Sequence, residues 1–213
     1  MKYKCIIFDC DGVLVDSEAI STSILIEMAK PLGLHIDSGF ATRQFSGKSL
    51  QNCFNFIEEK IAKKLPDNFE KEFRNKTFAA FKKDIKPIPG IHELLNKITI
   101  PYCVASSGPM EKIQLNLTTT NLIDKFTNRM FSAYDIGKWK PDPGIFLHAA
   151  NKMGFQPNEC VVIEDSMAGV EAANAGGFDV YAFVNEGHEN IFENTTAAVF
   201  YKMNELQNLL NMS

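Results

Sequence analysis

A cluster of carboxylic acids follows a short apolar run near the N-terminus. The segment IIFDCDGVLVDS (6–17) passes from apolar residues directly into Asp9 and Asp11, with only Cys10 between them, and Asp16 follows. Two like charges about 4 Å apart repel by roughly 4 kcal/mol when the effective dielectric constant is near 20. A folded chain that keeps these acids together therefore needs a positive partner beside them.

Polar residues follow other apolar runs in the same way. In an open α/β sheet, ligands bind outside the carboxyl ends of the strands, so these positions are the candidate site. The residues concerned are Asp9, Asp11 and Gly12 after the first run, and then Ser106, Ser107, Gly108, Lys140, Glu164, Asp165 and Ser166. Carboxylates suit a hard cation, whereas hydroxyl and backbone N–H groups suit an anion. A magnesium ion and a phosphate group together would satisfy the whole set.

Short apolar runs bounded by polar or glycine-containing turns indicate the strands of one sheet. They lie at 4–8, 102–106, 129–133, 160–164 and 179–184. Segments with helical spacing lie between the later runs, such as the one that contains Ile145, Ala149 and Met153. Strands that alternate with helices are typical of a parallel sheet with helices on both faces. The sequence therefore predicts a doubly wound α/β core.

The interval 18–85 interrupts this alternation. It contains no convincing strand, and apolar residues recur there with helical spacing in three successive patterns. Their members are Ile20, Ile24, Leu25, Met28 and Leu32; then Leu50, Phe54, Ile57 and Ile61; and then Phe69, Phe73 and Phe81. We expect an inserted α-helical cap domain at 18–85 on a core formed by 1–17 and 86–213, with a proline-stiffened hinge at 86–90. The phenylalanines are expected to form the core of the cap.

Composition limits the possible partners and the compartment. The 213 residues are 45% hydrophobic and 23% charged with a formal net charge of −4, which offers no electrostatic attraction to nucleic acid. Five cysteines without a C-x-x-C pair favour reduced thiols and a reducing compartment. No segment approaches 18 uncharged apolar residues, so no membrane span is predicted. We expect a cytoplasmic protein with a small-molecule ligand, and a monomer by default.

Four motifs resemble, in the same order, those of the phosphohydrolases of the haloacid dehalogenase superfamily. They are DCDGVLVDS (9–17), VASSG (104–108), KWKPDP (138–143) and IEDSMAG (163–169). The resemblance covers nearly the whole chain and is to the branch with a helical cap, which includes β-phosphoglucomutase. Within that branch, SSGPMEKIQ (106–114) and FSAYDIGKWKPDP (131–143) are similar to bacterial 6-phosphogluconate phosphatases. The implied activity is magnesium-dependent hydrolysis of a sugar phosphate or a sugar-acid phosphate.

The resemblance also implies roles for the reacting residues. Asp9 would attack phosphorus and form an aspartyl phosphate, and a carboxylate of ordinary pKa is already ionised at neutral pH. Asp11 would protonate the leaving oxygen and later activate water, with a pKa raised by a neighbouring carboxylate and a dry site. Ser106 would hydrogen-bond the phosphoryl group, and Lys140 would balance its charge. Lys138 is the alternative lysine in the same motif.

Ligands for the metal and the substrate are implied in the same way. Magnesium would bind the side chains of Asp9 and Asp165 and the backbone carbonyl of Asp11, with Glu164 either a further ligand or a hydrogen-bond acceptor behind them. A cap that closes over the leaving group would select the substrate, and 41–50 is its candidate specificity loop. The expected substrate contacts are Gly12, Ser107, Gly108, Gly47 and Lys48.

Two other functions stay open. A β-phosphoglucomutase-like phosphotransferase would return the phosphoryl group to its substrate. Such mutases carry a histidine early in the first cap helix. In this chain the corresponding position is occupied by Ser21 or one of its neighbours, which disfavours mutase activity. A non-catalytic sensor of a phosphorylated metabolite would need only the pocket. The intact set of predicted reacting residues disfavours a sensor, because a sensor could lose Asp11 without losing affinity.

Overall fold

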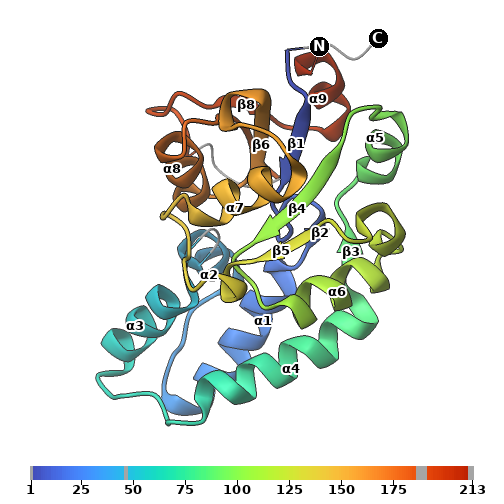
Figure 1. Ribbon diagram of the computed structural model, residues 1–213. Helices are drawn as coiled ribbons and strands as arrows, with labels where there is room; N and C mark the ends of the chain where they lie inside the picture. The colour runs from blue at the N-terminus through green and yellow to red at the C-terminus, as the bar shows by residue number, and fades with distance from the viewer. Residues whose placement is uncertain (1, 46–47, 186–190, 211–213) are drawn as a thin grey trace.

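A six-stranded sheet forms the centre of the molecule. The computed structural model describes residues 2–45, 48–185 and 191–210, and Figure 1 shows the sheet with helices on either side. Within these residues the strand order is β5-β4-β1-β6-β7-β8 and every pairing is parallel. The strands are β1 (Cys5–Phe8), β4 (Tyr102–Ser106), β5 (Met130–Ser132), β6 (Cys160–Glu164), β7 (Asp179–Phe183) and β8 (Ala198–Phe200). The predicted doubly wound α/β fold is confirmed.

The two faces of β1 explain why its sequence is continuously apolar. Ile6 and Phe8 point into one buried cluster, whereas Cys5 and Ile7 point into another on the opposite face. The first cluster lies under α5 (Ile91–Lys97), α6 (Met110–Thr119) and α9 (Met203–Leu209), and the second under α7 (Gly144–Met153) and α8 (Met167–Ala175). A strand that is covered on both faces has no side in contact with solvent, so polar and apolar residues do not alternate along it.

A group of helices lies beyond the carboxyl ends of the strands, at the end of the molecule opposite both chain termini (Figure 1). It consists of α1 (Glu18–Ala29), a 3₁₀ turn (Lys30–Leu32), α2 (Ser38–Phe45), α3 (Leu50–Ile61) and α4 (Phe69–Asp84). This helical group has its own buried cluster, which includes Leu25, Ile57 and Phe73. Phe81 of α4 packs instead with the cluster of the sheet. The helical group thus has a separate core and is seated on the sheet through one end of α4.

A two-stranded antiparallel ribbon joins the helical group to the sheet. It pairs β2 (Val15–Asp16) with β3 (Lys86–Pro87), so both crossings of the chain are hydrogen-bonded to each other. The ribbon lies where the sequence predicts the domain boundaries. The division into a core of 1–17 and 86–213 and a cap of 18–85 stays a prediction.

Several short elements have no clear signal in the sequence. The strands β2 and β3 span two residues each, and β8 spans three, so none shows a usable periodicity. The predicted loop 41–50 is wrong in its first half, because α2 continues to Phe45, and α3 already begins at Leu50. Residues 46–47 lie outside the described residues. The buried residues of α2 are only Ala41 and Phe45, which is too few to define an apolar face.

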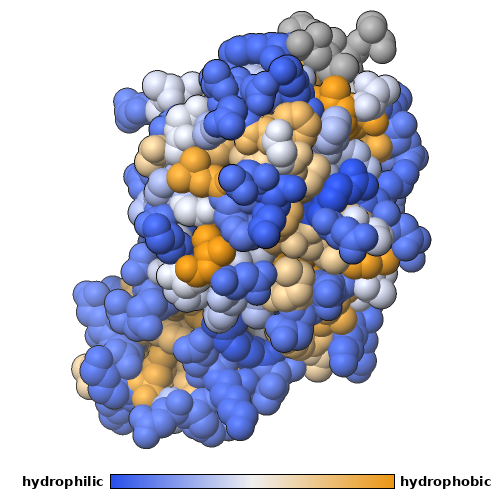
Figure 2. All heavy atoms as spheres, in the orientation of Figure 1, coloured by the Kyte–Doolittle hydropathy of each residue, from blue (hydrophilic) through white to orange (hydrophobic). Residues whose placement is uncertain are grey.

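The surface carries few large apolar side chains. Figure 2 shows hydrophobic residues scattered among hydrophilic ones on one face of the molecule. Tyr134 and Trp139 are among the large apolar side chains that are exposed. In the described parts of the chain, no helix combines the length and apolar character needed to cross a membrane. All five cysteines belong to these parts, and each is buried with a free thiol.

We expect Ile57→Ala to destabilise the helical group by about 2–5 kcal/mol, because it leaves a cavity at a fully buried position. If the helical group is a separate domain, amide hydrogen exchange will accelerate in α1 to α4 but not in β1 and β4. Mass spectrometry of deuterium uptake measures both regions, and Ile191→Ala at a half-exposed side chain is the control. Equal acceleration in the central strands would contradict the predicted division.

Candidate active site

A cleft of about 540 Å³ lies between the helical group and the carboxyl ends of the strands. Ligands bind at this end of open α/β sheets. Of the residues predicted from the sequence, the cleft is lined by Asp9, Asp11, Ser106, Ser107, Gly108, Lys140, Asp165 and Lys48. Glu164 is completely buried behind this surface. Gly47 lies outside the described residues.

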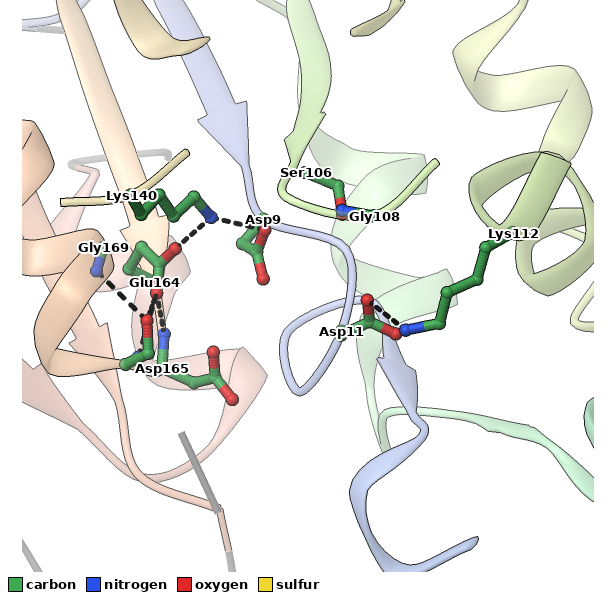
Figure 3. Close-up of polar contacts among 10 residues, drawn as sticks. Asp9, Asp11, Ser106, Gly108, Lys112, Lys140, Glu164, Asp165 and Gly169 are labelled. Atoms are coloured by element: carbon green, nitrogen blue, oxygen red, sulfur yellow. Dashed lines mark hydrogen bonds and ion pairs between the residues drawn. The ribbon is translucent and has the colours of Figure 1, made fainter. Parts of the chain in front are cut away.

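Lys140 is buried between two carboxylates. Its ammonium donates to Asp9 at 2.6 Å and forms a second ion pair with Glu164 (Figure 3). Burial lowers the pKa of Lys140, but the two carboxylates outweigh burial and raise this pKa above its usual value. Lys140 therefore remains charged at any physiological pH. Lys138, the alternative lysine, is 59% exposed and lies 3.9 Å from Asp142.

Glu164 has both carboxylate oxygens occupied. Oε1 faces Lys140, and Oε2 accepts the backbone N–H groups of Asp165 and Ser166 and the Ser166 hydroxyl, each at 2.9 Å. Gly169 makes room for this arrangement, because a Cβ there would lie 1.9 Å from Glu164 Cδ. The contacts favour Glu164 as a buried acceptor that positions Lys140 over Glu164 as a direct metal ligand.

The carboxylates of Asp9, Glu164 and Asp165 form a possible cation site. They offer oxygen atoms that all lie within 4.8 Å of one another. In the described chain, nothing donates a hydrogen bond to the Asp165 carboxylate or forms an ion pair with it. Burial raises the pKa values of Asp9 and Asp165, and neighbouring negative charges raise them further. Three carboxylates beside the single ammonium of Lys140 leave excess negative charge, which a hard, oxygen-seeking cation such as Mg²⁺ would fit.

Gly12 allows the chain to turn between the two aspartates and the ribbon. Its φ is +78°, and a Cβ at this position would lie 1.7 Å from Asp165 Oδ2. Its N–H donates to the carbonyl of Val15 at 2.8 Å, and Gly12 does not line the cleft. The structure thus places Gly12 where it accommodates Asp165, rather than at the surface where a substrate contact was expected.

The loop after β4 is held by one hydrogen bond within the loop and one from the neighbouring strand β5. The N–H of Gly108 donates to the Ser106 hydroxyl at 3.0 Å, and the Ser132 hydroxyl donates to the Gly108 carbonyl at 2.7 Å. Ser106 is 1% exposed, and its neighbour Ser107 also lines the cleft. This loop therefore presents a fixed hydroxyl beside the carboxylates, as anion binding requires.

Asp11 has a basic partner that the sequence patterns do not single out. Its carboxylate accepts from Lys112 Nζ at 2.7 Å, from the Ser17 hydroxyl at 2.6 Å and from Asn116 Nδ2 at 3.3 Å (Figure 3 shows Lys112). Lys112 and Asn116 are four residues apart on α6 and share one face. Two polar residues four positions apart, on a helix that directly follows a strand with predicted site residues, are the sequence signal that could have indicated Lys112 and Asn116. The Ser17 hydroxyl donates to Asp11 and does not cap α1.

The prediction of a raised pKa for Asp11 is wrong. Burial does raise the pKa, but the charge of Lys112 and the hydrogen bonds from Lys112 and Ser17 outweigh burial, and the net direction is downward. The sequence shows no contact between residues that are 101 positions apart. Asp11 is thus held as a carboxylate, the form that accepts a proton.

Comparison with known proteins agrees with this geometry. Residues 3–177 match the family model for haloacid dehalogenase-like hydrolases. The chain is 30% identical over 209 residues to the 6-phosphogluconate phosphatase of Escherichia coli K12, covering 98% of this chain and 95% of that one.

Two solved structures share the fold over 98% of both chains. The crystal structure of a haloacid dehalogenase-like protein from Agrobacterium tumefaciens has a TM-score of 0.90 at 29% identity. A putative β-phosphoglucomutase from Thermotoga maritima has a TM-score of 0.78 at 27% identity. The same arrangement of sheet and helices thus occurs in a protein described as of unknown function and in one described as a putative β-phosphoglucomutase.

We expect Gly12→Ala to lower the unfolding temperature more than Gly154→Ala. The φ angles are +78° and +82°, so both variants share a backbone cost of about 1–2 kcal/mol. A Cβ at position 12 collides with Asp165, whereas a Cβ at position 154 has nothing within 4 Å. Circular dichroism during heating measures both transitions. An equal decrease in the two variants would mean that Asp165 moves away at no cost.

Replacing Lys112 by methionine should raise the pKa of Asp11, because the apolar stem stays while the ammonium is lost. Carbon NMR of the carboxyl groups measures this pKa, with Asp11→Asn to identify the resonance. Because the folded-state pKa of Asp11 is lowered, the pair stabilises the fold above the unfolded-state pKa and loses this effect as the pH falls through the folded-state pKa.

The stability difference between wild type and Lys112→Met should therefore shrink on acidification. Lys125→Met is the matched control, since Lys125 contacts Asn96 at an exposed site. An Asp11 pKa that is the same in Lys112→Met and wild type would contradict the assigned role of the pair.

Proposed function

Because the chain belongs to the haloacid dehalogenase-like hydrolase family and is a phosphoric monoester hydrolase, we propose that it is a magnesium-dependent phosphatase of sugar phosphates or sugar-acid phosphates such as 6-phosphogluconate. The observation that carries this proposal is the pairing of Asp9 with buried Lys140 on the cleft wall, beside Asp165 and the Ser106 hydroxyl. A carboxylate nucleophile, an ammonium, an acidic cation site and an anion-binding loop are the parts that phosphoryl transfer uses.

The first step transfers the phosphoryl group to the protein. A carboxylate oxygen of Asp9 attacks phosphorus, the bond from phosphorus to the leaving oxygen breaks, and an aspartyl phosphate forms. Asp11 donates a proton to the leaving oxygen, which departs as an alcohol. Lys140 offsets the charge beside the nucleophile, and the Ser106 hydroxyl donates to a phosphoryl oxygen.

The second step releases phosphate. Asp11, now a carboxylate, takes a proton from a water molecule that attacks the phosphorus, and Asp9 is regenerated. The lowered pKa of Asp11 keeps it in the carboxylate form that this step needs. The first step needs the protonated form, which becomes more populated when a bound substrate anion draws Lys112 away from Asp11.

The cation would be held by the side chains of Asp9 and Asp165 and by the backbone carbonyl of Asp11. When bound, Mg²⁺ supplies positive charge that neutralises the carboxylates and favours the negative transferring group. Burial and neighbouring carboxylates raise the pKa of Asp9, and a neighbouring divalent charge would lower it. The nucleophile would thus be ionised at neutral pH when the cation is present.

The mutase alternative has one specific observation in its favour, the fold shared with the putative β-phosphoglucomutase. Against it stands Ser21, which lines the cleft near the start of α1 and donates its hydroxyl proton to the Ser17 carbonyl at 2.8 Å. A histidine imidazole has a pKa near neutral pH and can act as a general acid or base there, whereas a serine hydroxyl does not. Hydrolysis is therefore the activity that we propose.

Phosphate release from a panel of sugar phosphates, measured with Mg²⁺ and with excess chelator, tests the proposal. We expect release that depends on Mg²⁺ and that Asp9→Asn lowers by at least about 1,000-fold. Asp16→Asn, the same chemical change outside the cleft lining, should retain activity.

Three results would contradict the proposal. An isomeric sugar phosphate in place of free phosphate would indicate a mutase. Phosphate binding without turnover of any substrate would indicate a sensor. Full activity of Asp9→Asn would exclude Asp9 as the nucleophile.

A further inference from the structure

Several residues that line the cleft have no part in the chemistry described above, and three of them contact one another. They are Arg74 of α4, and Tyr134 and Trp139 of the segment that follows β5. Arg74 Nη2 donates to Tyr134 Oη at 3.1 Å, so the contact links the helical group to the α/β core. The two aromatic rings pack edge to face, with centroids 5.2 Å apart. Aromatic walls with a few directed polar groups are typical of small-molecule sites.

Helix α4 sets the distance between Arg74 and the reacting groups. Phe81 of the same helix lies beside the acid/base pair, since Lys112 Nζ is 5.5 Å from its ring centroid and Lys112 contacts Asp11. Arg74 precedes Phe81 by about two helical turns, which places it on the same face and about 10 Å along the axis. Thr77, between them, also lines the cleft. An extended six-carbon chain with a phosphate ester at one end and a carboxylate at the other has a comparable distance between its phosphorus and its carboxyl carbon.

Arg74 already binds one carboxylate, that of Glu70. Nε and Nη2 of Arg74 both donate to Oε1 of Glu70, at 2.9 and 2.7 Å. The side chains are 34% and 51% exposed, and an exposed ion pair within one helix contributes little to stability. A substrate carboxylate can therefore replace Glu70 at small cost. The planar guanidinium binds such a group with two parallel hydrogen bonds.

We propose that Arg74, held beside Tyr134, binds an anionic group at the end of the substrate remote from the phosphate, and that this group is the carboxylate of a sugar-acid phosphate. The inference rests on the proposed function, because it takes the phosphate to lie at Asp9. A sugar phosphate that has no carboxylate leaves Arg74 with Glu70. The cleft therefore prefers the acid over the corresponding aldose phosphate.

The test compares 6-phosphogluconate with glucose 6-phosphate. Both carry phosphate on carbon 6, but the first is an open chain with a carboxylate at carbon 1 and the second is mainly a ring without a carboxylate. Arg74→Gln should lower kcat/KM for 6-phosphogluconate roughly 10- to 100-fold, because charge-assisted hydrogen bonds are lost. The value for glucose 6-phosphate should change less than about 3-fold, since no such bond is made. Arg74→Lys, which keeps the charge but not the two-pronged geometry, should be intermediate.

Lys76→Gln is the matched control. Lys76 lies on the same helix outside the cleft lining, 3.9 Å from Glu27, and its side chain is 52% exposed. This variant should leave both substrates unchanged. Unfolding midpoints of all variants show whether any loss of activity comes from loss of the fold.

A binding measurement separates recognition from turnover. Trp139 is the only tryptophan of the chain and packs against Tyr134. Its fluorescence should report binding of 6-phosphogluconate to the Asp9→Asn protein with Mg²⁺, and adding Arg74→Gln should raise Kd roughly 10- to 100-fold.

The failures of the two proposals are distinguishable. Absence of phosphate release from either compound by the wild-type protein would overturn the proposed function. Release from both, with Arg74→Gln changing both equally or neither, would leave the phosphatase intact and overturn the role of Arg74. Loss of the preference in Lys48→Gln but not in Arg74→Gln would assign the carboxylate to Lys48 instead.

Discussion

The ion pairs of Lys140 with Asp9 and Glu164 are the interaction on which the site depends. Burying carboxylates is unfavourable unless they have charged or hydrogen-bonding partners, and Lys140 serves two of them at once. Glu164 is fixed in turn by two backbone N–H groups and a hydroxyl, so the ammonium of Lys140 lies at a defined place beside Asp9. Gly169 belongs to the same constraint, because any side chain there would displace Glu164.

The two aspartates of one short motif have opposite electrostatic environments. Burial and nearby carboxylates raise the pKa of Asp9, whereas the ammonium of Lys112 and the hydroxyl of Ser17 lower the pKa of Asp11. Carboxylates whose pKa values are pushed apart can take different roles in one reaction. Here the excess negative charge lies with Asp9 and Asp165, where a cation would bind, whereas Asp11 is held as a carboxylate by Lys112 and Ser17.

The sheet and the helical group contribute different properties to the cleft. Strand ends and their loops carry the reacting residues, and the paired β2 and β3 keep both crossings of the chain together. The helical group adds Arg74 and a wall of side chains from α1, α3 and α4. On the proposed function, the reaction takes place at the sheet, and the helical group would contact the remote end of the substrate and could vary without disturbing the reacting residues.

The sequence by itself determined the parallel sheet, the positions of five of its strands and the family. These follow from local patterns, because apolar runs such as Cys160–Glu164 and motifs of adjacent residues are visible without knowing the fold. Only the tertiary structure decided which charges meet. Lys112 reaches Asp11 and Arg74 reaches Tyr134 across long stretches of chain, and Glu164 is saturated by its neighbours. Pair interactions depend on distance and burial in space, and no periodicity along the chain encodes either.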